Sequence, residues 1–417
     1  MRLCFLNLLF LLGYISSFSA SLSGSKGLGE ESWPLDAHRR SLGYSGEAFC
    51  DKKTYSLLNP ARTAFNEKTS FSTTLDFGST RINEKGQTGV QGNFKIPNIN
   101  FAFATPYGTL GLSYWQRYVK NFQFKSPSSL DSLETSMEFK GGTSELAPSW
   151  ATAFGRNFAL GMIFHLIMGR ETRYAEIPVS SPQQELYPNI SKTTLFEKVE
   201  VRNLFSNESF WKRLSFSAQA HFKTWDAFLS STMPYSFDRE ITSRSYLDNG
   251  DSLILPRDTV NQKMPLRIGG GVFYMPVPRW GVSMDIWKDF WETSAISIHN
   301  APGFSVSAQQ SANDELRVGA GVERFGSGRF YDPYLEKSSY RIGGTYQRMY
   351  LEKKDRFLAT TGIGLPLGKS GAQADISLEG GWIGRLSDEN SPPEYVMGIS
   401  LSFTGISNWG QTSRRYR

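Results

Sequence analysis

The stretch QADISLEGGW, residues 373–382, alternates polar and apolar side chains along its length. One set comprises Gln373, Asp375, Ser377 and Glu379, and the set facing the other way comprises Ala374, Ile376, Leu378, Gly380 and Trp382. Because successive side chains of a β-strand point to opposite faces, this order predicts a strand with one polar and one apolar face.

The same alternation returns in other parts of the chain, over residues 214–223, 266–274, 282–286 and 395–403. A soluble β-sandwich also alternates in this way, so the period alone is compatible with two classes of exported protein. These are a large soluble β-protein and a transmembrane β-barrel. After the N-terminal leader, no apolar run approaches the roughly 20 residues that a membrane-spanning helix needs.

The spacing of the turns favours the barrel. Short turns are predicted at residues 105–108, 155–157, 223–226, 276–279 and 368–371, and longer polar connections over residues 81–92, 121–145, 172–213, 237–263, 293–314 and 388–393. Tight periplasmic turns and longer outer loops are typical of outer-membrane barrels. We therefore predict an all-β fold, a transmembrane antiparallel barrel of about 14 strands over residues 68–409.

Composition agrees with this class. The 417 residues include 39 Gly, 30 Phe, 18 Tyr and 10 Trp. Aromatic clusters near predicted strand ends, such as Tyr114-Trp115 and Trp287, are expected in girdles at the membrane interfaces, and the alternative is that they are core aromatics. The formal charge of +6 is modest for this length, so we expect contact with outer-membrane lipid and no binding of nucleic acid.

The N-terminus predicts export. Residues 1–20 combine Arg2, an apolar run and small residues at a cleavage site, which is typical of a secretory signal peptide. Cys4 lies within this leader, so Cys50 is the only cysteine expected in the mature chain. One thiol excludes an internal disulfide, and we expect neither a metal site nor a cofactor. At the other end, residues 410–417 predict a basic periplasmic tail.

Residues 21–67 lack the strand pattern. Within them, SLGYSGEAFCDKKTYSLLNPARTAF, residues 41–65, is rich in small residues that let backbones approach closely. Pro60 fixes its own φ and moves Asn59 out of the helical region, which predicts a turn. We interpret residues 21–67 as an arm and a compact plug inside the barrel. The alternative is a cap packed beside an ordinary β-domain.

Five features of the sequence, taken in chain order, resemble those of a known family. They are Asn59-Pro60-Ala61 just before a first strand near residues 70–77, the Pro-Gly turn at 106–108, the hairpin at 265–291, the Gly-Leu-Pro-Leu-Gly turn at 364–368 and a last strand ending near Trp409. In this order they resemble the FadL-like outer-membrane proteins, the long-chain fatty acid transporter family and its relatives in Bacteroidetes-type bacteria. The resemblance covers roughly residues 41–409.

The resemblance implies a barrel closed by an N-terminal hatch, through which hydrophobic small-molecule ligands pass before leaving sideways through the wall. Asn59, Pro60 and Ala61 would be the hatch motif. Asn59 suits this position because its side chain can bond backbone groups that a proline turn leaves unpaired. The lateral opening is not carried over, because the expected third strand, residues 108–120, shows no bulge signature beyond Gly111.

Enzymatic functions find less support. His165 and His221 both fall on the inward phase of neighbouring strands, but at different heights, so no shared metal or catalytic site is expected. Inward polar residues, namely Asp285, Asp375, Glu379 and Arg267, are expected to form a hydrogen-bonded polar lumen. The chain is therefore predicted not to be an enzyme.

The function predicted from the sequence is an outer-membrane channel for uptake of hydrophobic small molecules, such as long-chain fatty acids, by diffusion past the hatch. The alternative is a FadL-like barrel that serves protein secretion or surface attachment as a docking platform, with a secretion-system or surface-protein partner. A transporter should have an apolar pocket between plug and wall, whereas a docking protein should bind partners through its long loops.

Overall fold

The computed structural model describes residues 28–84, 87–127, 134–178, 192–202, 212–247, 252–254, 257–293, 312–329, 331–350, 354–368, 371–384 and 393–407. The predicted signal peptide, residues 1–20, and the predicted basic tail, residues 410–417, lie outside these residues and stay predictions. Among the described residues, the helices are all too short or too polar to cross a bilayer.

The described strands close into an antiparallel barrel of fourteen wall strands, as predicted. They are β2 (Thr69–Glu84), β3 (Gln87–Thr105), β4 (Gly108–Val119), β5 (Phe122–Pro127), β6 (Glu134–Phe154), β7 (Phe158–Phe164), β8 (Leu166–Pro178), β9 (Lys192–Arg202), β10 (Leu214–His221), β11 (Trp225–Thr232), β12 (Tyr235–Leu247), β13 (Ser252–Ile254), β14 (Asp258–Met264), β15 (Leu266–Val277), β16 (Trp280–Phe290), β17 (Glu315–Arg324), β18 (Ser339–Arg348), β19 (Asp355–Leu367), β20 (Ala372–Ile383) and β21 (Glu394–Ser407). The ring closes where β2 pairs with β21.

Some wall strands are built from two consecutive segments. Pro265 separates β14 from β15, and Pro234 lies between β11 and β12. Proline has no N–H to give to a ladder, so each marks a local interruption in the wall.

Alternation places the apolar phase outside and the polar phase inside. On β20, Leu378 is 47% exposed on the outer surface, whereas the inward Asp375 is only 5% exposed. This matches the expected barrel, because the outer face meets lipid and the inner face lines the lumen.

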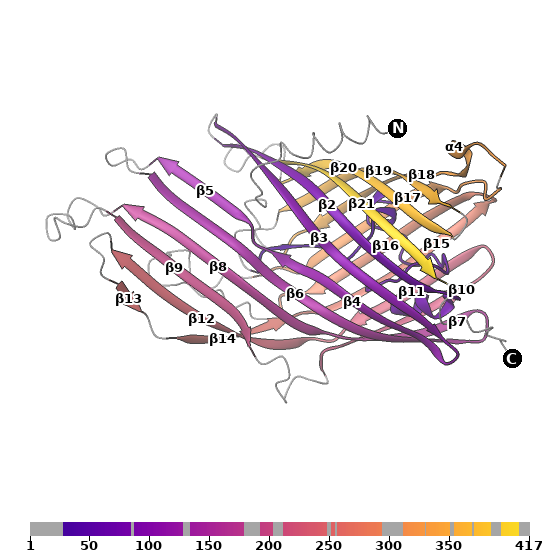
Figure 1. Cartoon of the computed structure of the whole chain (residues 1–417), viewed down its shortest axis with the longest axis horizontal. Helices are drawn as coiled ribbons and strands as arrows, with labels where there is room; N and C mark the ends of the chain where they lie inside the picture. The colour runs from indigo at the N-terminus through magenta and orange to yellow at the C-terminus, as the bar shows by residue number, and fades with distance from the viewer. Residues whose placement is uncertain are drawn as a thin grey trace.

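Several connections predicted as loops are instead strands. The ranges 121–145, 172–213 and 237–263 contain β5 and parts of β6, β8, β9 and β12 to β14. Figure 1 shows β5, β8, β9, β12 and β13 projecting past the ends of β16 to β21, and we call these five strands the strand extension. Their outer face carries charge pairs such as Lys198–Glu200 at 2.7 Å, and the apolar residues of β9 and β12, such as Val199, are the buried inward ones, which reverses the pattern of the lipid-facing strands.

The connection between β17 and β18 was not predicted. It lies at the end of the barrel that carries the short turns and includes the helix α4 (Tyr334–Lys337) (Figure 1). Tyr331 and Leu335 in this connection are exposed.

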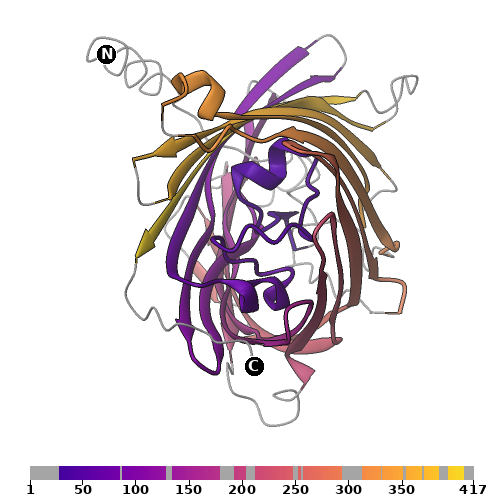
Figure 2. The same ribbon diagram turned by 90° about the vertical axis from the view of Figure 1, so that its right-hand side faces the viewer.

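Residues 28–66 lie inside the barrel, and we call them the N-terminal segment. Figure 2 shows this indigo segment within the ring of strands. It contains β1 (Glu30–Glu31), α2 (Ala37–Ser41) and η2 (Pro60–Phe65). Asp36 begins α2 by accepting a hydrogen bond from the Arg39 backbone N–H at 2.9 Å, and Pro60 begins η2, where its missing N–H costs no helical bond.

Glycines let the N-terminal segment touch the wall. Gly43 has a φ of +70°, and a Cβ placed there would lie 2.3 Å from the Gly344 carbonyl oxygen. On β18, a Cβ at Gly343 would lie 2.3 Å from the Gly43 backbone nitrogen. The backbones are therefore closer here than side chains would permit.

Candidate functional site

The tripeptide Asn59-Pro60-Ala61 lies against β10 on the inner side of the wall. Asn59 is fully buried, and its Nδ2 donates to the Glu47 carbonyl at 3.0 Å and to Gln219 Oε1 at 2.6 Å. The Ala61 backbone N–H donates to Ser217 Oγ at 2.9 Å. The three residues thus join the segment to the barrel, while their role as a hatch stays a prediction.

Gly161 of β7 and Gln219 of β10 also contribute to the contact between the tripeptide region and the wall. A Cβ at Gly161 of β7 would lie 2.4 Å from the Ala61 nitrogen, so only glycine permits the approach. Gln219 also donates from Nε2 to the Ala48 carbonyl at 2.8 Å. The polar phase of residues 214–223 contained Ser217 and Gln219, but the sequence did not show which part of the N-terminal segment they contact.

Replacing Asn59 with alanine should loosen this contact. The Gln219 side chain and the Glu47 carbonyl would both lose a donor, and each unsatisfied buried group costs about 1–3 kcal/mol. We expect the compact gel form to convert to the unfolded form at lower temperature in a heat-modifiability assay. Asn261→Ala is the matched control, because the Asn261 amide bonds Asp238 on the exposed outer face. Equal conversion temperatures for the two variants would contradict the assignment.

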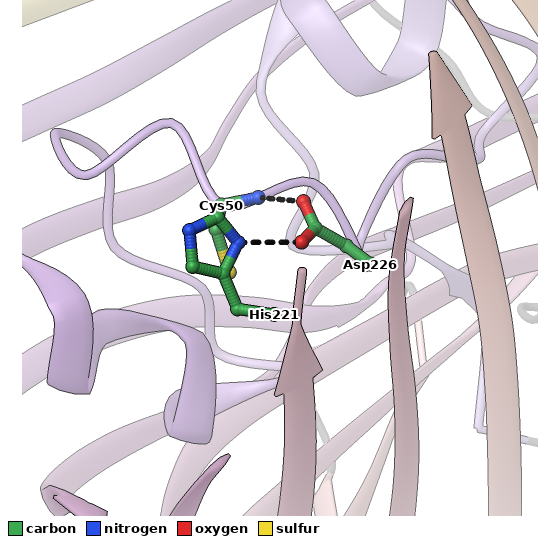
Figure 3. A group of neighbouring side chains, drawn as sticks. All are labelled: Cys50, His221 and Asp226. Carbon is green, nitrogen blue, oxygen red and sulfur yellow. Dashed lines mark hydrogen bonds and ion pairs between the residues drawn. The ribbon is translucent and has the colours of Figure 1, made fainter. Parts of the chain in front are cut away.

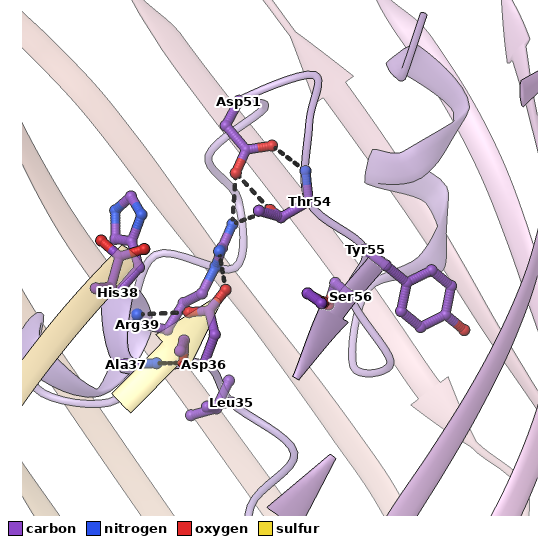
Figure 4. A network of polar contacts seen from close by, with 12 residues as sticks. Leu35, Asp36, Ala37, His38, Arg39, Asp51, Thr54, Tyr55 and Ser56 are labelled. Atoms are coloured by element: carbon purple, nitrogen blue, oxygen red, sulfur yellow. Dashed lines mark hydrogen bonds and ion pairs between the residues drawn. The ribbon is translucent and has the colours of Figure 1, made fainter. Parts of the chain in front are cut away.

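An arginine cluster organises the N-terminal segment internally (Figure 4). Arg39 bonds Asp36, and its Nη2 lies 3.2 Å from Asp51 Oδ2 and 3.0 Å from Thr54 Oγ1. Arg62 reaches the same Thr54 hydroxyl at 3.1 Å. Burial raises the pKa of the Asp51 carboxyl, but Arg39 and Arg62 outweigh it and hold that pKa well below its usual value.

Ion pairs and hydrogen bonds attach this segment to strands around the barrel. Arg40 pairs with Asp76 of β2 at 2.6 Å, and Tyr44 donates to Glu379 of β20 at 2.7 Å. Asp285 of β16 accepts from the Glu47 backbone N–H at 3.0 Å. Other contacts come from β6, β17, β19 and β21, made by Ser149, Glu323, Thr360 and Ser402.

The wall is broken between β3 and β4. Within the described residues, the β3–β4 ladder ends at Asn98 and Trp115. β4 then shifts its register against β6 between Gln116 and Tyr118. The sequence pattern of residues 108–120 did not predict this irregularity. At this point β1 pairs Glu30 with Val119, so the N-terminal segment takes the edge that β3 leaves.

Charged groups fill the lumen behind this break. Glu31 lies 2.6 Å from Arg267, and Glu30 lies 3.5 Å from Lys95 of β3. A cavity of about 50 Å³ nearby has charged side chains in its lining, among them Asp76 and Arg356. The described surroundings of the segment are closely packed: charged groups lie behind the break, and buried apolar clusters, such as Trp33 and Leu58 with Phe273, lie elsewhere.

His165 and His221 lie in separate places. His165 contacts Glu145 at 2.7 Å and Ser215 at 2.6 Å, all on the wall. His221 lies six residues beyond Ser215, which is about 20 Å along a strand. There its Nδ1 is 2.6 Å from Asp226 Oδ1, and Cys50 lies beside the pair (Figure 3). We expected no cysteine metal site, and the grouping of Cys50 with His221 and Asp226 was missed.

Solved structures share this fold at low sequence identity. A FadL homologue from Pseudomonas aeruginosa superimposes with a TM-score of 0.60 at 13% identity, covering 91% of this chain and 99% of that one. The toluene transporter TodX from Pseudomonas putida gives a TM-score of 0.59 at 12% identity, covering 92% and 100%.

Sequence comparison gives the family. No curated protein is a significant match. The family model BamG matches residues 5–415, which is nearly the whole chain. With its closed barrel of FadL-like fold, this multi-pass outer-membrane protein belongs to the BamG family.

Proposed function

We propose that this protein is an outer-membrane docking barrel, which binds another protein of the cell envelope through the strand extension. The observation that carries the proposal is the polar outer face of these strands. Charge pairs and hydrogen bonds on this face include Glu240 with Arg257 at 3.5 Å and Asp238 with Asn261 at 2.8 Å. Strands that face lipid present apolar residues on their outer side. The polar outer face of the strand extension is therefore suited to contact with water and with a protein partner.

The filled lumen supports the same proposal. Passage through the barrel would require the N-terminal segment to leave contacts such as Arg40–Asp76 and Tyr44–Glu379. A charge left buried without its partner costs about 3–5 kcal/mol, and several such polar contacts would have to break together. A barrel held closed in this way is a rigid body that can present its outer surface without conducting.

Site-specific photocrosslinking in cells tests the docking proposal. A photoreactive amino acid at Lys198 or Glu240 should give a discrete adduct with one envelope protein. The same group at Ile342, an exposed apolar residue on the outer face of β18, should give no such adduct and serves as the control. Membrane insertion is checked for each variant by heat-modifiable mobility. Adducts absent from both extension positions in a folded barrel would overturn the proposal.

A second candidate function is uptake of hydrophobic small molecules, including long-chain fatty acids. It is supported by the likeness to FadL-type structures and by the wall break between β3 and β4. An outward-opening hollow of about 560 Å³ adds to it, lined by apolar residues that include Phe158, Leu160 and Leu229. The strands β7 and β10 that border this hollow also contact Asn59 and Ala61 from inside.

Uptake assays separate the two candidates. Cells that lack their own transporter but express this barrel would be given a labelled long-chain fatty acid or a small aromatic hydrocarbon. Under the docking proposal, uptake stays at the empty-vector rate. Uptake above that rate, changed by Asn59→Ala at matched expression, would favour the channel.

A further inference from the structure

Cys50, His221 and Asp226 come together from two distant parts of the chain. Cys50 belongs to the N-terminal segment, His221 ends β10 and Asp226 lies at the start of β11. One potential ligand atom from each residue lies within 4.8 Å of the other two. Figure 3 shows the thiol beside the imidazole ring, with the Asp226 carboxylate joined by dashed lines to the ring and to the Cys50 backbone nitrogen.

The hairpin and the backbone fix this grouping without using the thiol. His221 and Asp226 are directly opposed across the β10–β11 ladder, so both point to the same face. The Cys50 backbone N–H donates to Asp226 Oδ2 at 3.0 Å, and the Phe65 ring lies 5.2 Å from the His221 ring. These contacts hold Sγ close to the pair, although the sulfur itself makes none of them.

We propose that Cys50, His221 and Asp226 bind a Zn²⁺ ion that ties the N-terminal segment to the barrel wall. Thiolate, imidazole and carboxylate are the three ligand types that zinc accepts in tetrahedral sites. Bond lengths of about 2.0–2.3 Å place tetrahedral ligands roughly 3.3–3.8 Å apart. His221 Nδ1 and Asp226 Oδ1, which are 2.6 Å apart, would therefore separate by about 1 Å, and the Cys50 thiol lies within 4.8 Å of both residues. Water would take the fourth position.

Binding of Zn²⁺ would release one proton in all, from the Cys50 thiol. The Cys50 thiol becomes a thiolate and releases one proton to solvent. If Nδ1 is the ligand, its proton is replaced by the metal and the ring carries its proton on Nε2 instead, so the imidazole stays neutral. Asp226 exchanges its hydrogen bond from His221 for a bond to the metal.

Access and charge suit a divalent cation. The His221 side chain is 25% exposed near a short turn, whereas that of Asp226 is 3% exposed, so the site has an open side and a buried anchor. A second acidic group, Glu31 with Asp289 and Glu315, differs in this respect. Arg267 already bridges Glu31 and Asp289 at 2.5–2.6 Å, which leaves that group without need of a metal.

Cobalt substitution in the purified full-length barrel tests this site. After chelation, Co²⁺ should bind with a thiolate-to-cobalt charge-transfer band and the visible bands of a tetrahedral ion, and Zn²⁺ should displace it. Cys50→Ser, a nearly isosteric change, should abolish the thiolate band. His221→Gln and Asp226→Asn should each weaken binding by at least about 100-fold. Asp238→Asn on the exposed face is the control and should leave the spectrum unchanged.

A second measurement needs no variant. Zn²⁺ should slow alkylation of Cys50 in the wild-type barrel by at least tenfold, as followed by mass spectrometry of the Cys50 peptide. The proposal is overturned if wild-type protein gives no thiolate band, if Cys50→Ser keeps it, or if Zn²⁺ leaves the alkylation rate unchanged. These outcomes do not depend on the docking proposal, which the crosslinking experiment tests separately.

Discussion

Replacing Gly343 with valine should prevent the N-terminal segment from seating in the barrel. A Cβ at this position would lie 2.3 Å from both the Gly43 nitrogen and the Leu42 carbonyl carbon. Both are backbone atoms, so no side-chain rotation can relieve the overlap. We expect a cost at or above about 3 kcal/mol, the upper end for overpacked interiors.

Limited proteolysis of the folded barrel measures this effect. A loss of about 3 kcal/mol raises the population of the displaced segment, and its cleavage rate, by roughly 100-fold. Gly380→Val is the matched control, because a Cβ at Gly380 meets no atom within 4 Å among the described residues. If both variants are cleaved as slowly as the wild type, the contact between Gly43 and β18 does not hold the segment in place.

Arg39→Ala should release the same segment by an electrostatic route. The Arg39 side chain is almost fully buried between Asp36 and Asp51, with Glu47 at 3.7 Å. Its removal leaves buried carboxylates without their cation, which costs about 3–5 kcal/mol. Proteolysis should accelerate strongly, and conductance in planar bilayers should rise as the lumen opens. Arg348→Ala removes an exposed arginine of β18 and should have no effect.

The pH dependence of this variant follows from Asp51. Arg39 helps to hold the pKa of Asp51 below its value in an unfolded chain, so the pair stabilises the folded segment above that unfolded value, about 3.9. The stabilisation is lost as the pH falls through the lower folded pKa. The difference in cleavage rate between wild type and variant should therefore be largest above about pH 4 and shrink in stronger acid. A difference that grows on acidification would contradict this role.

The sequence predicted the barrel because lipid and lumen impose opposite polarities on alternate residues. Residues 373–382 show this contrast, and Leu378 and Asp375 lie outside and inside as expected. The strand extension lies beyond the apolar band, so both of its faces tolerate polar residues. In β9 and β12 the apolar residues, such as Val199 and Ile241, are the buried inward ones, so these strands lack the outward apolar phase by which lipid-facing strands are recognised.

The site was predictable only in part. The proline turn identified Asn59 to Ala61 as an unusual point, and the structure buries them. Their partner Gln219 lies 160 residues away, and a single sequence does not report which plug residue meets which strand. The sequence predicted Cys50 to be a lone thiol. His221 and Asp226 lie far from it in sequence, and only the folding of the β10–β11 hairpin brings them beside it. The register shift after Gln116 carries no glycine or proline to mark it.

The contacts of the N-terminal segment also constrain the order of assembly. Ala37 donates to Ser402, Tyr44 donates to Glu379 and His38 contacts Glu323, all on strands from the last quarter of the chain. These three contacts of the N-terminal segment therefore form only when the last strands are in place. β2, which follows the segment directly, pairs with β21, so the same last strands also close the ring. A chain that ends before β17 lacks the part of the wall that Ala37, His38 and Tyr44 contact.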